Sequence, residues 1–131
     1  MKKASDRILK RSVLSVLVTA ALYTPQVMAF TKNVNADNSP VKNETVDGYS
    51  QVVREDGRTE NITINYGGWQ NVYGTAINTT INSGGMQTVY SQGTATNTII
   101  NGGRQTVNPD GTASGTTINS GGMQTVYSQG T

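Results

Sequence analysis

Residues 79–94 read TTINSGGMQTVYSQGT, and the same sixteen residues recur without change at positions 116–131. A match of this length indicates an internal duplication, which is typical of repeat architectures. The shorter pattern G-G-x-Q-x-V occurs on both sides of this stretch: it begins at Gly67, Gly84, Gly102 and Gly121, and a degenerate copy begins at Gly48. Its glutamines stand at positions 51, 70, 87, 105 and 124, with spacings of 19, 17, 18 and 19 residues.

Each copy also has a second half, G-T-A followed by T-x-I-N, which begins at Gly74, Gly93 and Gly111. In both halves Val, Ile, Thr and Tyr alternate with polar residues, and this period favours β-strands. Glycines at the ends of these segments favour turns. A unit of two short strands cannot bury its own apolar face, so we predict that successive units stack as the rungs of a parallel β-solenoid.

Equivalent residues of such a stack lie about 4.8 Å apart. The predicted inward ladders are Val53, Val72, Val89, Val107 and Val126, and Ile64, Ile81, Ile100 and Ile118. We expect Ala76, Ala95 and Ala113 to fill a tight corner of the rung. We expect Asn65, Asn82, Asn101 and Asn119 to form a turn ladder in the left-handed conformation, with the Gly-Gly pairs making the sharp turn that follows.

Two other structures compete with the solenoid. A disordered low-complexity linker has a similar composition, but disorder does not require Val and Ile at a fixed phase. A meander of antiparallel hairpins also uses short strands, but it has no reason to repeat so evenly.

The N-terminal segment has the three regions of a secretory signal peptide in their usual order: a basic region, an apolar region and a cleavage site with small residues. Residues 1–11 carry five basic side chains against one acidic one, residues 12–24 form an apolar run, and small residues stand at Val27 and Ala29. We predict a signal peptide over residues 1–29, with the cut between Ala29 and Phe30. The alternative is the N-terminal amphipathic helix of a cytosolic protein. The apolar run is shorter than the roughly 20 residues of a membrane-spanning helix.

The composition of the remaining chain changes near its first glycine, Gly48, and we divide the chain into two segments there. Residues 30–46 are polar, contain Pro40 and have no glycine, so we predict a loosely ordered lead-in there. Residues 47–131 are the predicted solenoid, which stops at Thr131 in the middle of a copy.

Charge and composition exclude several functions. Residues 30–131 carry five basic and seven acidic side chains, a net charge of 5 − 7 = −2, which argues against a nucleic-acid partner. The chain has no Cys and no His, which removes disulfides and the usual catalytic bases. Beyond Glu60 only Arg104 and Asp110 are charged, and glycan-cleaving β-helices need clustered carboxylates. We therefore predict no enzyme activity, no cofactor and no metal.

The repeat resembles the passenger repeats of AIDA-type autotransporter adhesins, including the antigen 43-like group. Ser83-Gly84-Gly85-Met86-Gln87-Thr88-Val89, then Gly93-Thr94-Ala95 and Ile100-Asn101, carry this resemblance, which covers residues 47–131. It implies an all-β fold, a right-handed parallel β-solenoid (β-helix) of about four to five rungs. It further implies export through the Sec route to the cell surface or outer membrane, or secretion, and a C-terminal barrel that crosses the outer membrane.

The barrel of that family is absent from this sequence. We therefore expect a fragment of a longer passenger or a truncated gene product, held in the periplasm if the barrel is truly missing. Members of the family mediate cell adhesion, autoaggregation or biofilm formation. Several carry heptose on Ser and Thr, which implies O-glycosylation here.

The predicted function is therefore that of an adhesin passenger whose partners are other solenoid faces or a receptor on a host or cell surface. The candidate surface contacts are Trp69, Thr88, Thr106 and Thr125. Tyr73, Tyr90 and Tyr127 are either further contacts or an aromatic stack along the surface. The alternative is a non-adhesive structural or ice-binding β-solenoid, although the unequal rung lengths spoil a regular Thr array. The Asn-x-Thr sequons at Asn43, Asn61 and Asn78 are interpreted as chance.

Overall fold

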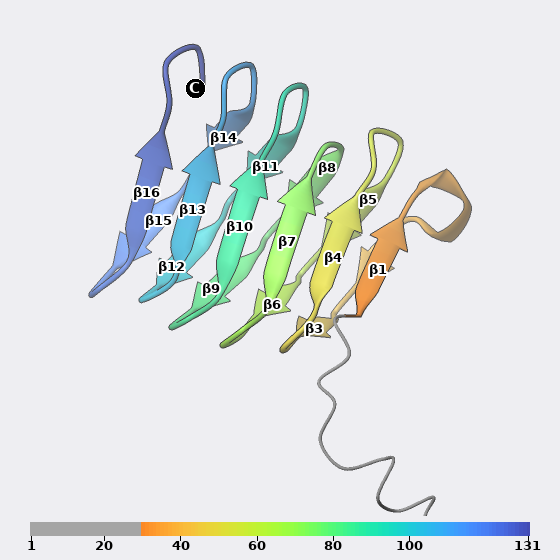
Figure 1. Ribbon diagram of the computed structural model, residues 1–131, viewed down its shortest axis with the longest axis horizontal. Coiled ribbons are helices and arrows are strands. Elements are labelled where there is room, and N and C mark those ends of the chain that lie inside the picture. Colours follow the sequence, from red (N-terminus) through yellow and green to blue (C-terminus); the bar gives the residue numbers. More distant parts are fainter. Residues whose placement is uncertain (1–29) are drawn as a thin grey trace, which may run out of the picture.

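The computed structural model describes residues 30–131, so the predicted signal peptide and its cut after Ala29 lie outside the described residues. The described chain forms sixteen β-strands and one 3-10 turn, η1 (Ala36–Asn38). The strands form three sheets, and every strand pairing within them is parallel. Neighbouring strands of a sheet come from successive repeats (Figure 1), which is the arrangement of a solenoid.

We refer to the three sheets as A, B and C. Sheet A contains β1 (Thr31–Val34), β4 (Ser50–Val53), β7 (Trp69–Val72), β10 (Met86–Val89), β13 (Arg104–Val107) and β16 (Met123–Val126). Sheet B contains β2 (Val41–Lys42), β5 (Arg58–Glu60), β8 (Thr75–Ile77), β11 (Thr94–Thr96) and β14 (Thr112–Ser114). Sheet C contains β3 (Thr45–Val46), β6 (Thr63–Ile64), β9 (Thr80–Asn82), β12 (Ile99–Asn101) and β15 (Thr117–Asn119).

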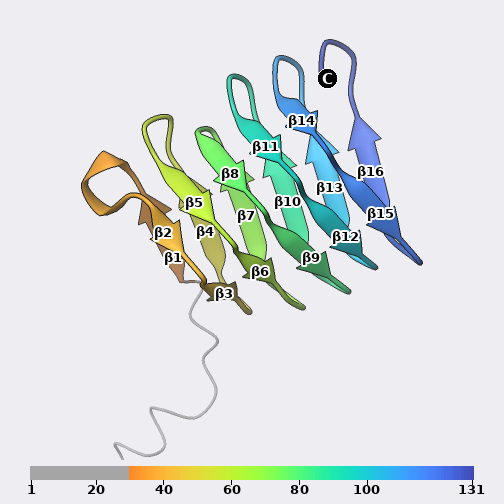
Figure 2. The ribbon, with the colours of Figure 1, turned by 180° about the vertical axis from the view of Figure 1, so that it is seen from behind.

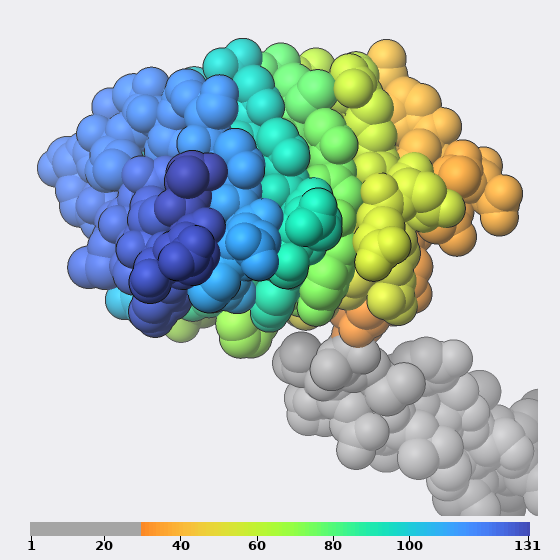
Figure 3. Space-filling model, turned by 90° about the horizontal axis from the view of Figure 1, so that it is seen from above, coloured from red at the N-terminus to blue at the C-terminus, as the bar shows by residue number. Residues whose placement is uncertain are grey.

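The chain winds through the sheets in the order A, B, C. In Figure 1 it rises through sheet A at the front, returns downward behind, and advances to the left, which is a right-handed coil. Figure 2 shows sheets B and C on the opposite side. Five coils of three strands are followed by β16, and in Figure 3 they lie against one another in chain order. The predicted all-β parallel solenoid is confirmed.

The second half of each repeat forms two strands where we expected one. Asn78 lies between β8 and β9 with a φ of 57°, and this left-handed residue turns the chain at a corner of the coil. Asn43, Asn61 and Asn97 hold the same place in other coils, with φ of 56°, 57° and 55°, and Gly115 follows with 69°. Asn and Gly adopt this conformation at lower cost than other residues. The coil therefore has three sides, with a corner that alternation alone did not indicate.

The left-handed turn ladder thus lies at other asparagines than predicted. Asn65 and Asn82 do not have positive φ; Asn82 ends β9, and its Nδ2 donates to Asn65 Oδ1 at 2.9 Å. In the same ladder, Asn119 Nδ2 donates to Asn101 Oδ1 at 2.6 Å. The glycines that follow make the turn, and the first of each pair has a φ of 75° to 80°: Gly67, Gly84, Gly102 and Gly121.

The second glycine of each pair is required by close packing. A Cβ on Gly85 would lie 2.6 Å from the carbonyl oxygen of Ile64, and a Cβ on Gly122 would lie 2.8 Å from that of Ile100. Any side chain here would push one coil away from the one before it. The Gly-Gly pair therefore combines a left-handed turn with a close approach of backbones.

Residues 30–46 form the first coil, so the prediction of a loosely ordered lead-in is wrong. Thr31–Val34 pairs in register with Ser50–Val53. Val34 continues the Val53 ladder, Val46 continues the Ile64 ladder, and both are fully buried. This coil has neither the Gly-Gly pair nor the glutamine on which the repeat was aligned, which explains why the motif did not reveal it.

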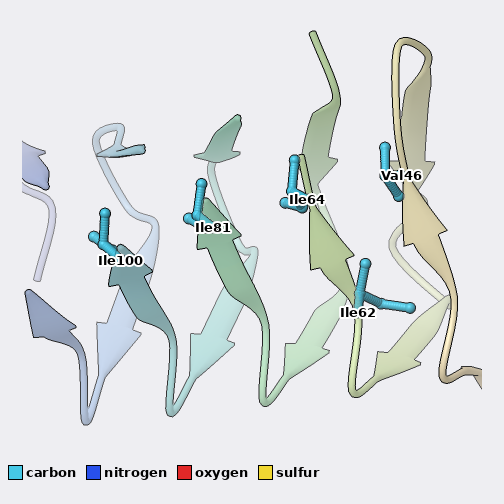
Figure 4. Close-up of a cluster of buried hydrophobic side chains, with 5 residues drawn as sticks. All are labelled: Val46, Ile62, Ile64, Ile81 and Ile100. Carbon is cyan, nitrogen blue, oxygen red and sulfur yellow. The ribbon is translucent and has the colours of Figure 1, made fainter. Parts of the chain in front are cut away.

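The apolar core consists of two groups of stacked side chains. Val46, Ile62, Ile64, Ile81 and Ile100 pack together along the axis, and all are fully buried (Figure 4). The second group contains Val72, Val89, Val107, Ala76 and Ala95, with Ala113 partly buried against it. These alanines lie in the middle of sheet B strands and point inward, so they do not occupy a corner as we expected.

Each predicted ladder ends with one residue that is not buried. Val126 is 47% exposed and Ile118 is 49% exposed, because both lie at the open end of the stack. The other four valines of the first ladder are fully buried: Val53, Val72, Val89 and Val107.

A row of glutamine side chains runs through the interior beside these ladders. Gln51, Gln70, Gln87 and Gln105 are fully buried. The Nε2 of each glutamine donates to the Oε1 of the one a coil earlier, at 2.8 Å (Gln70), 2.7 Å (Gln87), 2.6 Å (Gln105) and 2.7 Å (Gln124). Parallel strands in register favour such amide ladders. Glutamine and valine stand two residues apart in every copy, so they share the inward face of the strand.

In the fourth and fifth coils, a threonine on the opposite side of the coil hydrogen-bonds to this glutamine ladder, whereas the equivalent Thr79 Oγ1 has no partner within residues 30–131. Gln105 Nε2 also donates to Thr98 Oγ1 at 3.2 Å, and Gln124 Nε2 donates to Thr116 Oγ1 at 3.2 Å. Thr98 is fully buried, so these bonds cross a dry interior. They tie sheet A to the start of sheet C in coils that have only a small apolar core.

The first coil replaces this amide–hydroxyl pair with an ion pair. Lys32 is in register with Gln51, and its Nζ bonds the carboxylate of Glu44, which also accepts a hydrogen bond of 2.8 Å from the Tyr49 hydroxyl. In the second coil Ile62 stands where the threonine would be, and Gln51 Nε2 makes no hydrogen bond within residues 30–131. The ladder therefore begins at Gln51, beside a charged first coil.

Replacement of Gln87 by Leu is expected to lower the free energy of unfolding by about 2–4 kcal/mol. The reason is that Gln70 Oε1 and Gln105 Nε2 would each lose a partner inside a dry core. Leucine has a volume similar to that of glutamine, so most of the change in unfolding free energy comes from the lost hydrogen bonds. Urea denaturation followed by circular dichroism measures the change.

The matched control is Gln124→Leu, because Gln124 belongs to the same ladder but is only partly buried. We expect it to cost less than half as much. Equal losses for the two variants, or no loss for Gln87→Leu, would contradict the role assigned to the ladder.

Candidate functional surface

The outward face of sheet A carries the predicted surface contacts. Trp69, the first residue of β7, is 47% exposed. Thr88, Thr106 and Thr125 stand in one row in register, and Asn71 precedes them. Thr106 and Thr125 are half-buried, but Thr88 is only 8% exposed. The row therefore offers hydroxyl groups mainly in its last two coils.

The three tyrosines considered as surface contacts, Tyr73, Tyr90 and Tyr127, divide into a stacked pair and an exposed residue. The rings of Tyr73 and Tyr90 lie parallel, with centroids 4.5 Å apart and planes 7° apart. Burial raises the pKa of the Tyr90 hydroxyl, and Tyr73 adds to this shift. Tyr127 is 54% exposed. Stacking between coils therefore accounts for the first two, and only Tyr127 remains open as a contact.

A hollow of about 600 Å³ lies beside this stack, at the turn from sheet A to sheet B. It is lined by Arg54, Glu55, Asp56 and Tyr73. Arg54 Nε donates to Asn33 Oδ1 at 3.0 Å, so the guanidinium is held to the first coil. The three charged residues form an exposed turn before Gly57.

A second groove, of about 500 Å³, follows the corner between sheets B and C. One side is the left-handed asparagine row, in which Nδ2 of Asn61, Asn78 and Asn97 donates to the previous Oδ1 at 3.2, 3.2 and 3.4 Å. The other side is a row of outward residues from sheet C: Thr63, Thr80, Ile99 and Thr117. None of these residues is charged, so this groove offers amides, hydroxyls and the 41%-exposed side chain of Ile99.

A third groove, of about 250 Å³, follows the corner between sheets C and A. Its lining consists of the glycine pairs from Gly84 to Gly121 and the first residues of three sheet A strands, Met86, Arg104 and Met123. These turns lie along the lower edge of the stack in Figure 1. In the sequence, what these three side chains share is their place in the repeat, directly after a Gly-Gly pair.

The ion pairs lie in the first two coils. Burial raises the pKa of the Glu44 carboxyl, but hydrogen bonds from Lys32 and Tyr49 outweigh it and hold the pKa below its ordinary value. Burial, with the Glu44 carboxylate, raises the pKa of the Tyr49 hydroxyl well above its usual range. Hydrogen bonds from Lys42 and Arg58 lower the pKa of the Glu60 carboxyl.

Residues 30–131 contain no group of three or more Asp, Glu, His or Cys side chains able to hold a metal ion. In the same part of the chain, no helix is long and apolar enough to cross a membrane. The repeated surfaces and their corner grooves are therefore the features from which a function can be argued.

Comparison with known proteins agrees with this arrangement. No family model matches the chain. A probable autotransporter of Escherichia coli K12, YpjA, is 46% identical over 114 residues, which cover 82% of this chain and 7% of YpjA. The crystal structure of a TibC-catalysed hyper-glycosylated fragment of TibA, residues 55–350, superposes with a TM-score of 0.65 and 46% identity. That match covers 72% of this chain and 35% of the TibA fragment.

These comparisons confirm the resemblance that the repeat indicates: the chain is similar in sequence to an autotransporter and in sequence and fold to the TibA fragment. The chain spans a small part of the length of YpjA and about a third of the TibA fragment.

Acid is expected to remove the contribution of Glu44 to stability. Its pKa is lowered in the folded chain, so the contribution is full above the ordinary value of about 4.5 and is lost as the pH falls through the folded value. The difference in unfolding free energy between the native chain and Glu44→Gln should therefore shrink between about pH 5 and pH 2.

Urea titrations at several pH values measure this difference. Glu60→Gln is the control, because Lys42 and Arg58, the partners of Glu60, are about half exposed, and ion pairs with exposed partners contribute little. A difference for Glu44→Gln that stays constant with pH would contradict the assignment.

Proposed function

We propose that the chain is part of a surface adhesin passenger that mediates cell adhesion, autoaggregation or biofilm formation. The observation that carries the proposal is the in-register stack of autotransporter-type coils, which repeats the same outward side chains along one axis. Many weak contacts repeated along a surface add up to firm attachment. Similarity to an autotransporter supports export through the Sec route to the cell surface or into the medium.

The function proposed for this surface is binding without catalysis. The described residues hold no carboxylate cluster or metal group of the kind that glycan-cleaving β-helices need. The relatives found are an autotransporter and a glycosylated passenger fragment. These observations support a partner held at the surface and released unchanged.

Sheet A is the face proposed for self-association. Its strands are four residues long, against two or three in sheets B and C. Trp69 projects from it, and Thr106 and Thr125 supply hydroxyl groups that a second solenoid can meet. Thr88 completes the row but is largely enclosed. A regular ice-matching array has less support, because Ile99 interrupts the threonine row of sheet C.

Cells that display this chain on an autotransporter barrel should settle faster than cells that display the barrel alone. Mixing them with fluorescently marked cells that lack the chain separates the two modes of adhesion. Self-association keeps the marked cells out of the aggregates, whereas binding to a cell-surface receptor brings them in. Unchanged settling, together with unchanged attachment to a substratum, would contradict an adhesive function.

The variant that tests the face is Thr106→Asp, which adds a charge to sheet A. We expect it to slow settling several-fold. Thr96→Asp is the control, since Thr96 is a similarly half-buried outward residue on sheet B. Equal effects of both substitutions would rule out sheet A as the specific contact.

We further propose that the outward Ser and Thr residues are O-glycosylation sites. The solved TibA fragment was hyper-glycosylated by TibC, and 72% of this chain matches it. Sheet B carries exposed or half-exposed hydroxyl groups in register, including Thr94 and Thr112. These are accessible to a transferase without unfolding of the coil.

Mass spectrometry of the exported chain, from cells with and without TibC, measures the modification. We expect added sugar masses on outward residues such as Thr94 and Thr112, and none on the fully buried Thr59, Thr79 and Thr98. An unchanged mass, or modification of Thr98 at the same level as Thr112, would contradict the proposal.

A further inference from the structure

The groove between sheets C and A has a floor without side chains. Its turns are Gly-Gly pairs, so the backbone of Gly84, Gly85, Gly102, Gly103 and Gly121 forms the floor over three coils. The ring of Tyr66 lies against Gly84 and limits the groove toward the N-terminal coils. The result is a shallow trench of about 250 Å³ that runs along the solenoid axis.

One wall of this trench is a single row of large side chains. Met86, Arg104 and Met123 are the first residues of successive sheet A strands and stand in register. Trp69 continues the row one coil earlier, beyond the residues that line the trench. Met123 is 50% exposed, and methionine thioethers form a polarizable apolar surface suited to contact with C–H groups.

Arg104 gives the trench one unbalanced positive charge. It is the only Lys or Arg after Arg58 in the sequence. Within residues 30–131 the salt bridges join Lys32, Lys42 and Arg58 to glutamates, and none includes Arg104. Asp110, the one acidic residue after Glu60, lies in the turn beyond the opposite end of β13. The guanidinium therefore has no carboxylate partner in the groove.

We propose that this trench binds a saccharide carrying a single carboxylate. The carboxylate would accept two parallel hydrogen bonds from the planar guanidinium of Arg104. The apolar face of the adjoining sugar ring would lie on Met86, while the glycine floor admits the chain without steric hindrance. Met86 and Met123 stand on either side of Arg104, two coils and about 10 Å apart, so the trench fits an oligosaccharide better than a free sugar acid.

Charge complementarity favours a single carboxylate over a polyanion. Polyanions bind through several basic side chains together, and the coils around this trench have only Arg104. The inference rests on the proposed adhesive function and gives the chemical class of a receptor for it.

Two native methionine methyl groups allow a direct test. Met86 and Met123 are the only methionines in residues 30–131, and both line the trench. The exported chain is labelled with ¹³C at the methionine methyl groups and titrated with 3′-sialyllactose, lactose or a heparin tetrasaccharide. We expect saturable shifts of the Met86 methyl signal with sialyllactose, in the millimolar range, and none with lactose.

The decisive variant is Arg104→Met, because Met is the residue of the coils on both sides and fits the row. We expect it to weaken sialyllactose binding by about tenfold to a hundredfold. Arg58→Gln is the control, since it removes the same charge from a residue of sheet B that is paired with Glu60. It should leave binding unchanged.

Three results would overturn the proposal: equal shifts with lactose, unchanged binding by Arg104→Met, or a response to heparin without one to sialyllactose. Cell settling separates this inference from the adhesive function on which it rests. Displayed chain that promotes settling but does not bind sialyllactose contradicts the saccharide site alone. Chain that binds sialyllactose but promotes neither settling nor attachment contradicts the adhesive function alone.

Discussion

The structure depends on a ladder of buried glutamine amides. Each Gln Nε2 bonds the Oε1 of the coil before it at 2.6–2.8 Å, so the coils are locked at one spacing and one register. A slip of one residue would place every amide outside and leave buried groups unpaired, which is costly. The apolar ladders then stack because the amides have fixed the register. With coils this thin, specificity comes from polar bonds as much as from apolar burial.

The same spacing determines the outer surface. Whatever side chain stands outward in one coil has its counterpart about 4.8 Å along the axis, so rows and grooves extend over several coils. The three corners of the coil differ in chemistry: one charged turn beside the stacked rings of Tyr73 and Tyr90 at the first, asparagine amides at the second, and glycine backbone at the third. A single change in the repeat therefore alters the surface at one place. Arg104, for example, puts one positive charge into a row in which the neighbouring coils have methionine.

Much of the fold could be predicted from the sequence, because the phase of Val72, Ile81 and their equivalents specifies a parallel stack. The third side of the coil could not, since one left-handed Asn78 divides a segment that alternates like a single strand. The first coil could not be predicted from the repeat motif, because the ion pair between Lys32 and Glu44 takes the place of the glutamine there. Among the surface residues, Trp69 could be predicted as a candidate contact, because it is the only tryptophan in the sequence. The grooves could not be predicted, because they depend on which turns the coiling brings side by side.

Hydrogen exchange of the glutamine side-chain amides, measured by NMR on the exported chain, reports whether these amides are bonded to one another inside the stack. We predict that the Nε2 protons of Gln70, Gln87 and Gln105 exchange far more slowly than those of Gln92, which lies on an exposed turn. Protection of this kind requires stacked coils with the amides inside. Exchange of all these glutamines at the rate of free amides would contradict the ladder and the register that depends on it.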